Sequence, residues 1–187
     1  MEGDGPTECS PVTCVNPVDG VRKPGSVGTP IWGVEVRVVD EKSRPVPTGD
    51  VGEIAIRGHN VMKGYYNRPE ETAEVLKDGW MHTGDLGRID EKGFVYITGR
   101  KKEIIVLSNG KNINPVTLEE KIKAASQYVL ECGVFLKNDI LQAIIVPDIH
   151  RMKYDGIDDY EDHIRWNLID RLNKEATPYK RIMKFYL

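Results

Sequence analysis

The chain is organised around two neighbouring runs of sequence, WMHTGDLGRID at residues 80–90 and FVYITGRKK at residues 94–102. Apolar residues recur in both runs at the spacing of strands, which predicts strands near residues 82–90 and 94–98. The short polar segment Glu91-Lys92-Gly93 between them is typical of a turn. The two runs therefore predict a β-hairpin.

Each strand of this hairpin carries a small polar cluster, TGD at residues 83–85 and GRKK at residues 99–102. The carboxylate of Asp85 can accept two hydrogen bonds from the vicinal hydroxyls of a ribose. The guanidinium of Arg100 offers several fixed donors to ribose or phosphate oxygens. A hairpin that brings the two together predicts a site for a polyhydroxy ligand; a turn-stabilising aspartate and a surface ion pair are the alternatives.

The segment before the hairpin changes character near residue 33. Residues 1–30 are rich in Gly, Pro, Thr and Ser and show little periodicity, which indicates loops. We expect them to be mobile or to pack against a neighbouring molecule, as a binding loop without its supporting structure does. Alternation at 34–38 and 53–58 predicts strands, and a short helix is expected at 71–76.

After Gly99 the composition shifts towards mixed helix and strand. Asn114 is a good N-cap for a helix that begins with Pro115. The fold class is therefore mixed α/β (α+β): a mostly antiparallel β domain at residues 1–98, followed by a small α+β domain at residues 99–187. Further elements of the second domain are strands at 103–107, 129–136, 141–146 and 182–187, a turn at 108–111, and a helix capped by Asp158 or Asp159.

Composition excludes several classes of function. The net charge of −3 gives no bulk attraction to nucleic acid, and no apolar run is long enough to span a bilayer. The N-terminal residues lack the features of a secretory signal. The odd count of cysteines, Cys9, Cys14 and Cys132, is typical of free thiols in a reducing cytoplasm and does not match a zinc site.

A third polar cluster lies in GPTE at residues 5–8, where the hydroxyl of Thr7 and the carboxylate of Glu8 stand side by side. Such a pair suits a phosphate with its Mg²⁺, because hard cations take oxygen ligands. Two other features leave alternatives open. His82 beside the TGD cluster suits either a structural role or acid–base work, and the pair Tyr65-Tyr66 either stacks on a base or anchors a core.

Four motifs follow one another along the chain: GDGPTE at 3–8, GEIAIRG at 52–58 continuing to GYYNRPE at 64–70, TGDL at 83–86, and GRKKEII at 99–105. Taken together, they resemble the adenylate-forming enzyme superfamily, the AMP-binding enzymes that include acyl- and aryl-CoA synthetases, peptide-synthetase adenylation domains and firefly luciferase. The stretch 99–115 is most similar to the long-chain fatty acyl-CoA synthetases (ligases).

The resemblance implies a two-step reaction of fatty acid metabolism. A carboxylate attacks the α-phosphate of ATP with Mg²⁺, giving an acyl-adenylate and pyrophosphate, and the thiol of CoA then displaces AMP. The partners implied are small molecules, namely a fatty or other carboxylic acid, ATP and CoA, without nucleic acid. A cytoplasmic location is expected, while peripheral membrane association and oligomeric state stay open.

The resemblance also assigns roles to individual residues. Thr7 would contact phosphate oxygens, and Glu8 would ligate Mg²⁺. Asp85 would hold the ribose hydroxyls, with Arg100 assisting. Lys102 falls at the hinge about which the small C-terminal domain of the family swings between the two half-reactions.

Three departures from the family pattern are visible. Asp4 stands where an aromatic residue usually stacks beside adenine. The phosphate loop and most of the acyl pocket belong to a region before residue 1, and the catalytic-lysine motif belongs beyond residue 187. No lysine near the end stands in the context of that motif; those residues are Lys174, Lys180 and Lys184.

The resemblance therefore implies that residues 1–98 are the C-terminal portion of the large AMP-binding domain and residues 99–187 its lid. The catalytic set would be incomplete, so we expect this chain alone to be inactive. The alternatives are a non-catalytic nucleotide- or partner-binding module, and a fragment of an acyl-carrier-protein synthetase or a peptide-synthetase adenylation domain. The acyl chain length and the thiol acceptor are left open.

Overall fold

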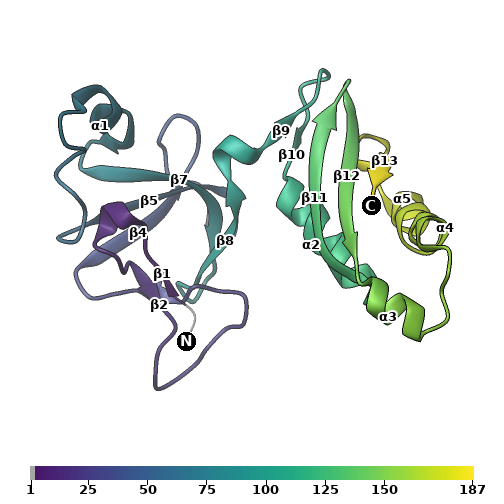
Figure 1. Ribbon diagram of the computed structural model, residues 1–187. Helices are drawn as coiled ribbons and strands as arrows, with labels where there is room; N and C mark the ends of the chain where they lie inside the picture. Colours follow the sequence, from purple (N-terminus) through teal and green to yellow (C-terminus); the bar gives the residue numbers. More distant parts are fainter. Residues whose placement is uncertain (1–2) are drawn as a thin grey trace. The chain divides into compact units, whose positions relative to one another are not determined.

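The computed structural model describes residues 3–187 and divides into two compact units (Figure 1). The first unit ends at Lys102, and the second runs from Glu103 to Leu187. The sequence placed the change of domain after residue 98. In the structure, strand β8 continues to Arg100 and a 3-10 turn follows it, so the first unit extends to Lys102.

The first unit is built on a five-stranded antiparallel sheet with strand order β4-β5-β7-β6, in which β8 also pairs with β7. The predicted mostly antiparallel unit and its central hairpin are confirmed. The bounds are β4 Val34–Val39, β5 Gly52–Gly58, α1 Pro69–Val75, β6 Leu76–Lys77, β7 Trp80–Ile89 and β8 Val95–Arg100.

Helix α1 lies slightly earlier than the predicted span of 71–76. Pro69 begins it, because a proline at the first helical position loses no hydrogen bond. Leu76 already belongs to β6 and pairs with Met81 of β7. Strand pairing therefore ends the helix before the apolar periodicity does.

Strand β5 is buried on both of its faces. Ile54 and Ile56 contribute to the main apolar core of the unit, while Ala55 packs with Trp80 on the opposite face. Two guanidinium groups lie over the indole of Trp80, with the central carbon of Arg37 at 3.9 Å and that of Arg57 at 4.6 Å from the ring centre. Burial on both sides restricts the movement of β5 within the packed sheet.

The expectation that residues 1–30 need an outside support is wrong for residues 3–30, which pack on this sheet. Cys9 and Cys14 are buried with Met81 and Val95 in the main core. The three short strands of this segment form an antiparallel sheet in sequence order. They are β1 Gly3–Asp4, β2 Cys14–Val15 and β3 Thr29–Pro30, with a 3-10 turn at Thr7–Cys9.

The second unit is a three-stranded sheet of order β11-β12-β13 with helices packed on it (Figure 1). Strand β13 joins β12 in parallel, while β11 and β12 form an antiparallel hairpin. No helix among residues 3–187 has the length and apolar character to cross a bilayer. The bounds are β9 Ile105–Val106, β10 Asn112–Ile113, α2 Pro115–Ala125, β11 Val129–Lys137, β12 Ile140–Pro147, α3 Ile149–Tyr154, α4 Tyr160–Ile164, α5 Asp170–Glu175 and β13 Ile182–Tyr186.

The helices of this unit share one core with the sheet. Ile122 of α2 and Leu168, in a π-helical segment that links α4 to α5, are both about 1% exposed and belong to the same core cluster as Ile145 of β12. The predicted cap is confirmed, since the side chain of Asn114 accepts from the N–H of Val116 at 3.1 Å. Asp159 caps α4 in the same way.

Two details of the second unit differ from the sequence prediction. The strand expected at 103–107 is reduced to β9, because a 3-10 turn at Lys101–Glu103 precedes it. Helix α3 was not predicted. It is short, capped by Asp148, and anchored by the fully buried Met152.

Packing of the N-terminal segment predicts a specific effect on stability. Gly28 (φ 94°) forms a bridge with Val95 of β8, and an added Cβ would overlap the backbone of Val15. Gly25 (φ 77°) has open space around it. Alanine at either position carries the left-handed strain of roughly 1–2 kcal/mol. We expect Gly28→Ala to cost about 1–3 kcal/mol more than Gly25→Ala through the added overlap.

Urea unfolding followed by tryptophan fluorescence measures this difference. Trp80 is buried, whereas Trp32 and Trp166 are exposed, so the signal reports mainly on the first unit. Equal destabilisation by the two glycine substitutions would contradict the docking of residues 3–30 on β8.

Candidate functional site

The TGD cluster lies in a bulge of β7. Between the pairs Ala55–His82 and Glu53–Leu86, strand β5 contributes one residue and strand β7 contributes residues 83–85. Such extra residues interrupt the regular alternation of side chains, and they recur next to active sites because they redirect a side chain. The bulge, and not the regular strand, therefore sets the direction of the aspartate.

Short hydrogen bonds hold the bulge in place. The hydroxyl of Thr83 donates to the carbonyl of Ile54 at 2.9 Å and accepts from the N–H of Asp85 at 3.0 Å. The N–H of Gly84 donates to Oε1 of Glu53 at 3.1 Å. Gly84 has φ 75°, a left-handed conformation that favours glycine. The Thr-Gly-Asp sequence thus matches the conformation that the bulge requires.

Strands β7 and β8 place Asp85 directly opposite Arg100. The Nε atom of Arg100 lies 3.2 Å from Oδ1 of Asp85. The aspartate side chain is 19% exposed and the arginine side chain 69% exposed. The hairpin therefore brings together the two side chains that the sequence analysis selected, with the carboxylate sheltered and the guanidinium reaching into solvent.

A buried carboxylate lies beneath this pair. Glu53 is 9% exposed, and its Oε2 atom accepts from Nζ of Lys101 at 3.0 Å and lies 3.3 Å from Nδ1 of His82. The second ring nitrogen of His82 lies 3.4 Å from the hydroxyl of Ser43. His82 is thus buried and engaged at both nitrogens, which supports the structural alternative for this residue.

The Lys101 contact also determines the ionisation of Glu53. Burial raises the pKa of Glu53, but hydrogen bonds from Lys101 and His82 lower it by more, so the pKa lies below its ordinary value of 4.5. Glu53 is therefore an ionised carboxylate inside the sheet.

Thr7 and Glu8 lie on the 3-10 turn at Thr7–Cys9, which is docked against the loop that follows β5. The N–H of Met62 donates to the carbonyl of Glu8 at 2.7 Å, and the side chain of Asn60 donates to the backbone of the same turn at 3.0 Å. The hydroxyl of Tyr65 donates to Oε1 of Glu8 at 2.8 Å. This bond raises the pKa of Tyr65 and orients the Glu8 carboxylate.

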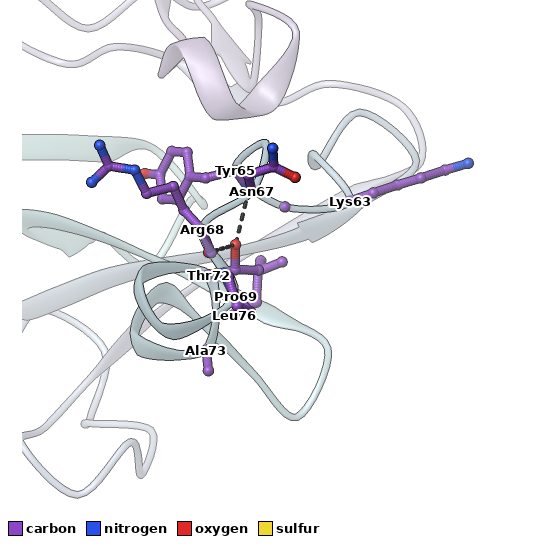
Figure 2. Close-up of a pocket in the computed structure, with 9 residues that line it drawn as sticks. Lys63, Tyr65, Asn67, Arg68, Pro69, Thr72, Ala73 and Leu76 are labelled. Carbon is purple, nitrogen blue, oxygen red and sulfur yellow. Dashed lines mark hydrogen bonds between the residues drawn. The ribbon is translucent and has the colours of Figure 1, made fainter.

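Tyr65 also borders an open hollow of about 430 Å³, shown in Figure 2. Its shape depends on Thr72, whose hydroxyl accepts from the N–H of Tyr65 at 2.9 Å and donates to the carbonyl of Arg68 at 2.6 Å. The hollow contains none of the residues to which the resemblance assigns a role, although Tyr65 lines it. Its lining is Lys63, Gly64, Tyr65, Asn67, Arg68, Pro69, Thr72, Ala73 and Leu76.

Asp4 has a structural use in this molecule. Its carbonyl accepts from both the N–H of Thr13, at 2.9 Å, and the hydroxyl of Thr13, at 3.0 Å. Burial raises the pKa of its carboxyl group, although a hydrogen bond from Thr13 partly opposes that effect. A side chain of this kind offers no flat apolar surface to an adenine ring.

A magnesium ion would fit the chemistry of Glu8 in one arrangement. Within residues 3–187, no three His, Cys, Asp or Glu side chains gather into a metal-binding group. Mg²⁺ is commonly held by one or two carboxylates together with substrate phosphates. The single oriented carboxylate of Glu8 beside Thr7 is compatible with a Mg²⁺ ion held jointly by the protein and by substrate phosphates. It is not compatible with a metal site built from protein groups alone.

Lys102 is exposed in the 3-10 turn that ends the first unit. In the second unit, the turn at 108–112 is locally fixed. The carboxylate of Asp139 accepts from both the N–H and the hydroxyl of Ser108. The ammonium of Lys111 lies 4.1 Å from the ring centre of Tyr179.

Sequence reasoning missed Glu53 and the contact between Tyr65 and Glu8. The sequence signal for Glu53 was its place at the start of the apolar run EIAI. A charged side chain in a strand that is buried on both faces needs a polar or charged partner. No local signal connects Tyr65 with Glu8, because the two residues are far apart in the sequence.

Two family models match the chain. One, described as AMP-binding enzyme, matches residues 1–66, and the other, described as AMP-binding enzyme C-terminal domain, matches residues 102–187. The first match contains the GDGPTE and GEIAIRG motifs, whereas TGDL at residues 83–86 lies between the two matches.

Individual relatives point in the same direction. The chain is 45% identical over 137 residues to a long-chain-fatty-acid–CoA ligase of Bacillus subtilis, covering 72% of this chain and 24% of that protein. It is 42% identical over 123 residues to a feruloyl-CoA synthase of an Amycolatopsis species, covering 65% of this chain and 25% of that protein. This chain spans about a quarter of the length of these curated relatives.

Solved structures share the fold. The crystal structure of ATP-bound MatB from Rhodopseudomonas palustris matches with a TM-score of 0.81 and 34% sequence identity. The match covers 95% of this chain and 34% of that one.

The ionised state of Glu53 predicts a pH dependence of stability. Since its folded-state pKa lies below the ordinary value of 4.5, the carboxylate contributes stability above that pH and loses it as the pH falls through the folded-state pKa. We expect the stability advantage of the wild type over Glu53→Gln to be greatest near neutral pH and to shrink below about pH 4.5. Urea unfolding of both proteins between pH 3 and pH 7 measures it. A constant difference across that range would show that folding leaves the pKa of Glu53 unshifted.

Proposed function

We propose that this chain, which belongs to the AMP-binding enzyme family, contributes the ribose-binding part of the nucleotide site and the C-terminal domain of an ATP-dependent acyl-CoA ligase. In that reaction a carboxylic acid and ATP give an acyl-adenylate and pyrophosphate, and CoA then gives the acyl-CoA and AMP. The observation that carries the proposal is the Asp85–Arg100 pair at 3.2 Å, held at the end of the hairpin by the bulge in β7.

The ribose role follows from the exposure and chemistry of the pair. A carboxylate can accept from two vicinal hydroxyls, and charge-assisted hydrogen bonds of this kind are among the strong ones. Arg100 is mostly exposed, so its guanidinium can turn from the carboxylate towards ligand oxygens without unpacking the sheet. Asp85 therefore fixes the ribose, and Arg100 assists.

The phosphate end of the nucleotide is assigned to the 3-10 turn. The hydroxyl of Thr7 contacts phosphate oxygens there, and the carboxylate of Glu8, oriented by Tyr65, holds Mg²⁺. The ion supplies positive charge that stabilises the charge developing on the phosphate oxygens. Docking of the turn on the loop after β5 gives these two side chains a fixed support.

We assign the second unit to the mobile lid and Lys102 to the hinge. The support is that the C-terminal-domain family model begins at residue 102 and that the first compact unit ends at Lys102. A short exposed turn is the kind of element that absorbs the backbone rotation of a rigid-body motion.

A long-chain fatty acid is the acid that we propose as substrate, on the strength of the similarity to the Bacillus subtilis ligase. The feruloyl-CoA synthase similarity makes an aromatic acid the second candidate. We also propose a cytoplasmic location, in keeping with three free thiols, at Cys9, Cys14 and Cys132.

Substitution of Asp85 tests the ribose assignment. Loss of hydrogen bonds to a charged group costs roughly 1.5–3 kcal/mol, so Asp85→Ala should raise the KM for ATP by about 10- to 100-fold. The measurement is ATP–pyrophosphate exchange as a function of ATP concentration in the full-length protein. Asp50→Ala, at an exposed turn of the same unit, is the control and should leave the KM unchanged. An unaltered KM in Asp85→Ala would refute the assignment.

A proline at the hinge tests the role of Lys102. Lys102→Pro restricts φ to about −65°, whereas Lys102→Ala removes the charge and leaves the backbone free. We expect the proline to slow one half-reaction much more than the other, because only one backbone arrangement stays accessible. Single-turnover rates of acyl-adenylate formation and of CoA transfer measure the two steps separately. Equal slowing of both, or the same effect from alanine, would argue against a hinge.

A further inference from the structure

The buried carboxylate of Glu53 contacts the residue before Asp85 and the residue after Arg100. Oε1 of Glu53 accepts from the N–H of Gly84 at 3.1 Å, and Gly84 directly precedes Asp85. Oε2 accepts from Nζ of Lys101 at 3.0 Å, and Lys101 directly follows Arg100. The two oxygens of one side chain thus connect the backbone of the bulge with the end of β8.

The strand that carries Glu53 is a stable reference for these contacts. Its pairs with Val39 of β4 and Leu86 of β7 leave it between two neighbouring strands. The next residues, Ile54 to Ile56, are buried on both faces of the sheet. A carboxylate on such a strand has little freedom to move, so the groups that it binds are fixed relative to the core.

The negative charge of Glu53 explains why its hydrogen bonds are strong. A buried carboxylate is costly unless donors satisfy it. Here the side chain is 10% exposed and is satisfied by Gly84, Lys101 and His82. Hydrogen bonds to an ionised acceptor are roughly twice as strong as neutral ones. Glu53 therefore holds the bulge and the end of β8 with its full charge.

Glu53 supports Asp85 and Arg100 in different ways, the first through the bulge and the second through the end of β8. Asp85 lies in a bulge that hydrogen bonds of Thr83 also hold in place. Arg100 is mostly exposed and is the last residue of β8, so its neighbour Lys101 is the anchor of the strand end.

We propose that Glu53 is a positioning residue of the nucleotide site. It sets the spacing between Asp85 and Arg100 through Gly84 and Lys101, and so determines how well the pair fits the two ribose hydroxyls. It does not itself touch the nucleotide. The inference rests on the proposed ribose site and adds the group that gives the site its geometry.

The test is discrimination between ATP and 2′-deoxy-ATP by the full-length protein. Glu53→Gln keeps the size of the side chain and removes its charge. We expect the ratio of kcat/KM for ATP to that for 2′-deoxy-ATP to fall by about tenfold, the lower end of the effect of removing a group that orients a ligand-binding residue. A purely structural role would lower both values together and leave the ratio unchanged.

A matched control is Glu35→Gln on the neighbouring strand β4. Its carboxylate is 61% exposed and pairs with Arg57, so the same chemical change is made outside the site. The ratio should stay at the wild-type value in this variant. A similar fall in Glu35→Gln and Glu53→Gln would overturn the proposal.

A second variant keeps the test decisive if Glu53→Gln fails to fold. The Lys101 side chain is 50% exposed, so Lys101→Met removes the ion pair without opening the core. It should lower the same ratio by a smaller factor than Glu53→Gln, because the Gly84 contact remains. An unchanged ratio in Lys101→Met would overturn the proposal.

Asp85→Ala in the same assay distinguishes failure of the positioning role of Glu53 from failure of the ribose site itself. Loss of the preference for ATP in Asp85→Ala, with an unchanged ratio in Glu53→Gln, would leave the ribose site standing and reject the positioning role. Retention of the preference in Asp85→Ala would reject the ribose site itself.

Discussion

The bulge in β7, where residues 83–85 lie opposite one residue of β5, is the constraint on which the candidate site depends. A regular strand would alternate its side chains between the two faces of the sheet. The bulge interrupts that alternation at Asp85, while the hairpin places Asp85 opposite Arg100 of β8. Thr83 and Glu53 satisfy the backbone groups that the irregular pairing would otherwise leave without partners.

Stability alone gives a weak reason for a charge at position 53. Replacing a buried ion pair by well-packed apolar side chains is often neutral or stabilising. An apolar residue at this position would still pack in the sheet, but it would offer no acceptor to Gly84 and Lys101. The carboxylate is therefore better explained by the local geometry that it enforces, since it determines where the bulge and the strand end lie relative to the core.

Much of this architecture could be predicted from local patterns. Alternation identified β4 and β5, and the central hairpin followed from two apolar runs joined by a polar turn. The Asn114-Pro115 pair located the start of α2 because capping and the proline act within one turn of helix. The proximity of Asp85 and Arg100 was also predictable, since a hairpin sets it. Their role at a ribose stays a prediction.

Features that depend on distant parts of the chain could not be predicted in this way. The register shift in β7 depends on which residue of β5 lies opposite, and this is not encoded within either strand. The order of residues 3–30 comes from buried Cys9 and Cys14 and from the close approach of Gly28 to Val15. Glycine-rich composition suggested loops there, but it carried no information about the packing that fixes them.

The position of Lys101 explains how the proposed ribose site and the proposed hinge at Lys102 can both operate. Lys101 is tied to Glu53 inside the first unit, and the second unit begins at Glu103. A backbone rotation confined to Lys102 would leave the contacts of Glu53 intact, and with them the positions of Asp85 and Arg100. A nucleotide held by that pair would then keep its ribose contacts while the second unit moved. The ion pair would therefore separate the proposed ribose site from the proposed hinge within two residues of chain.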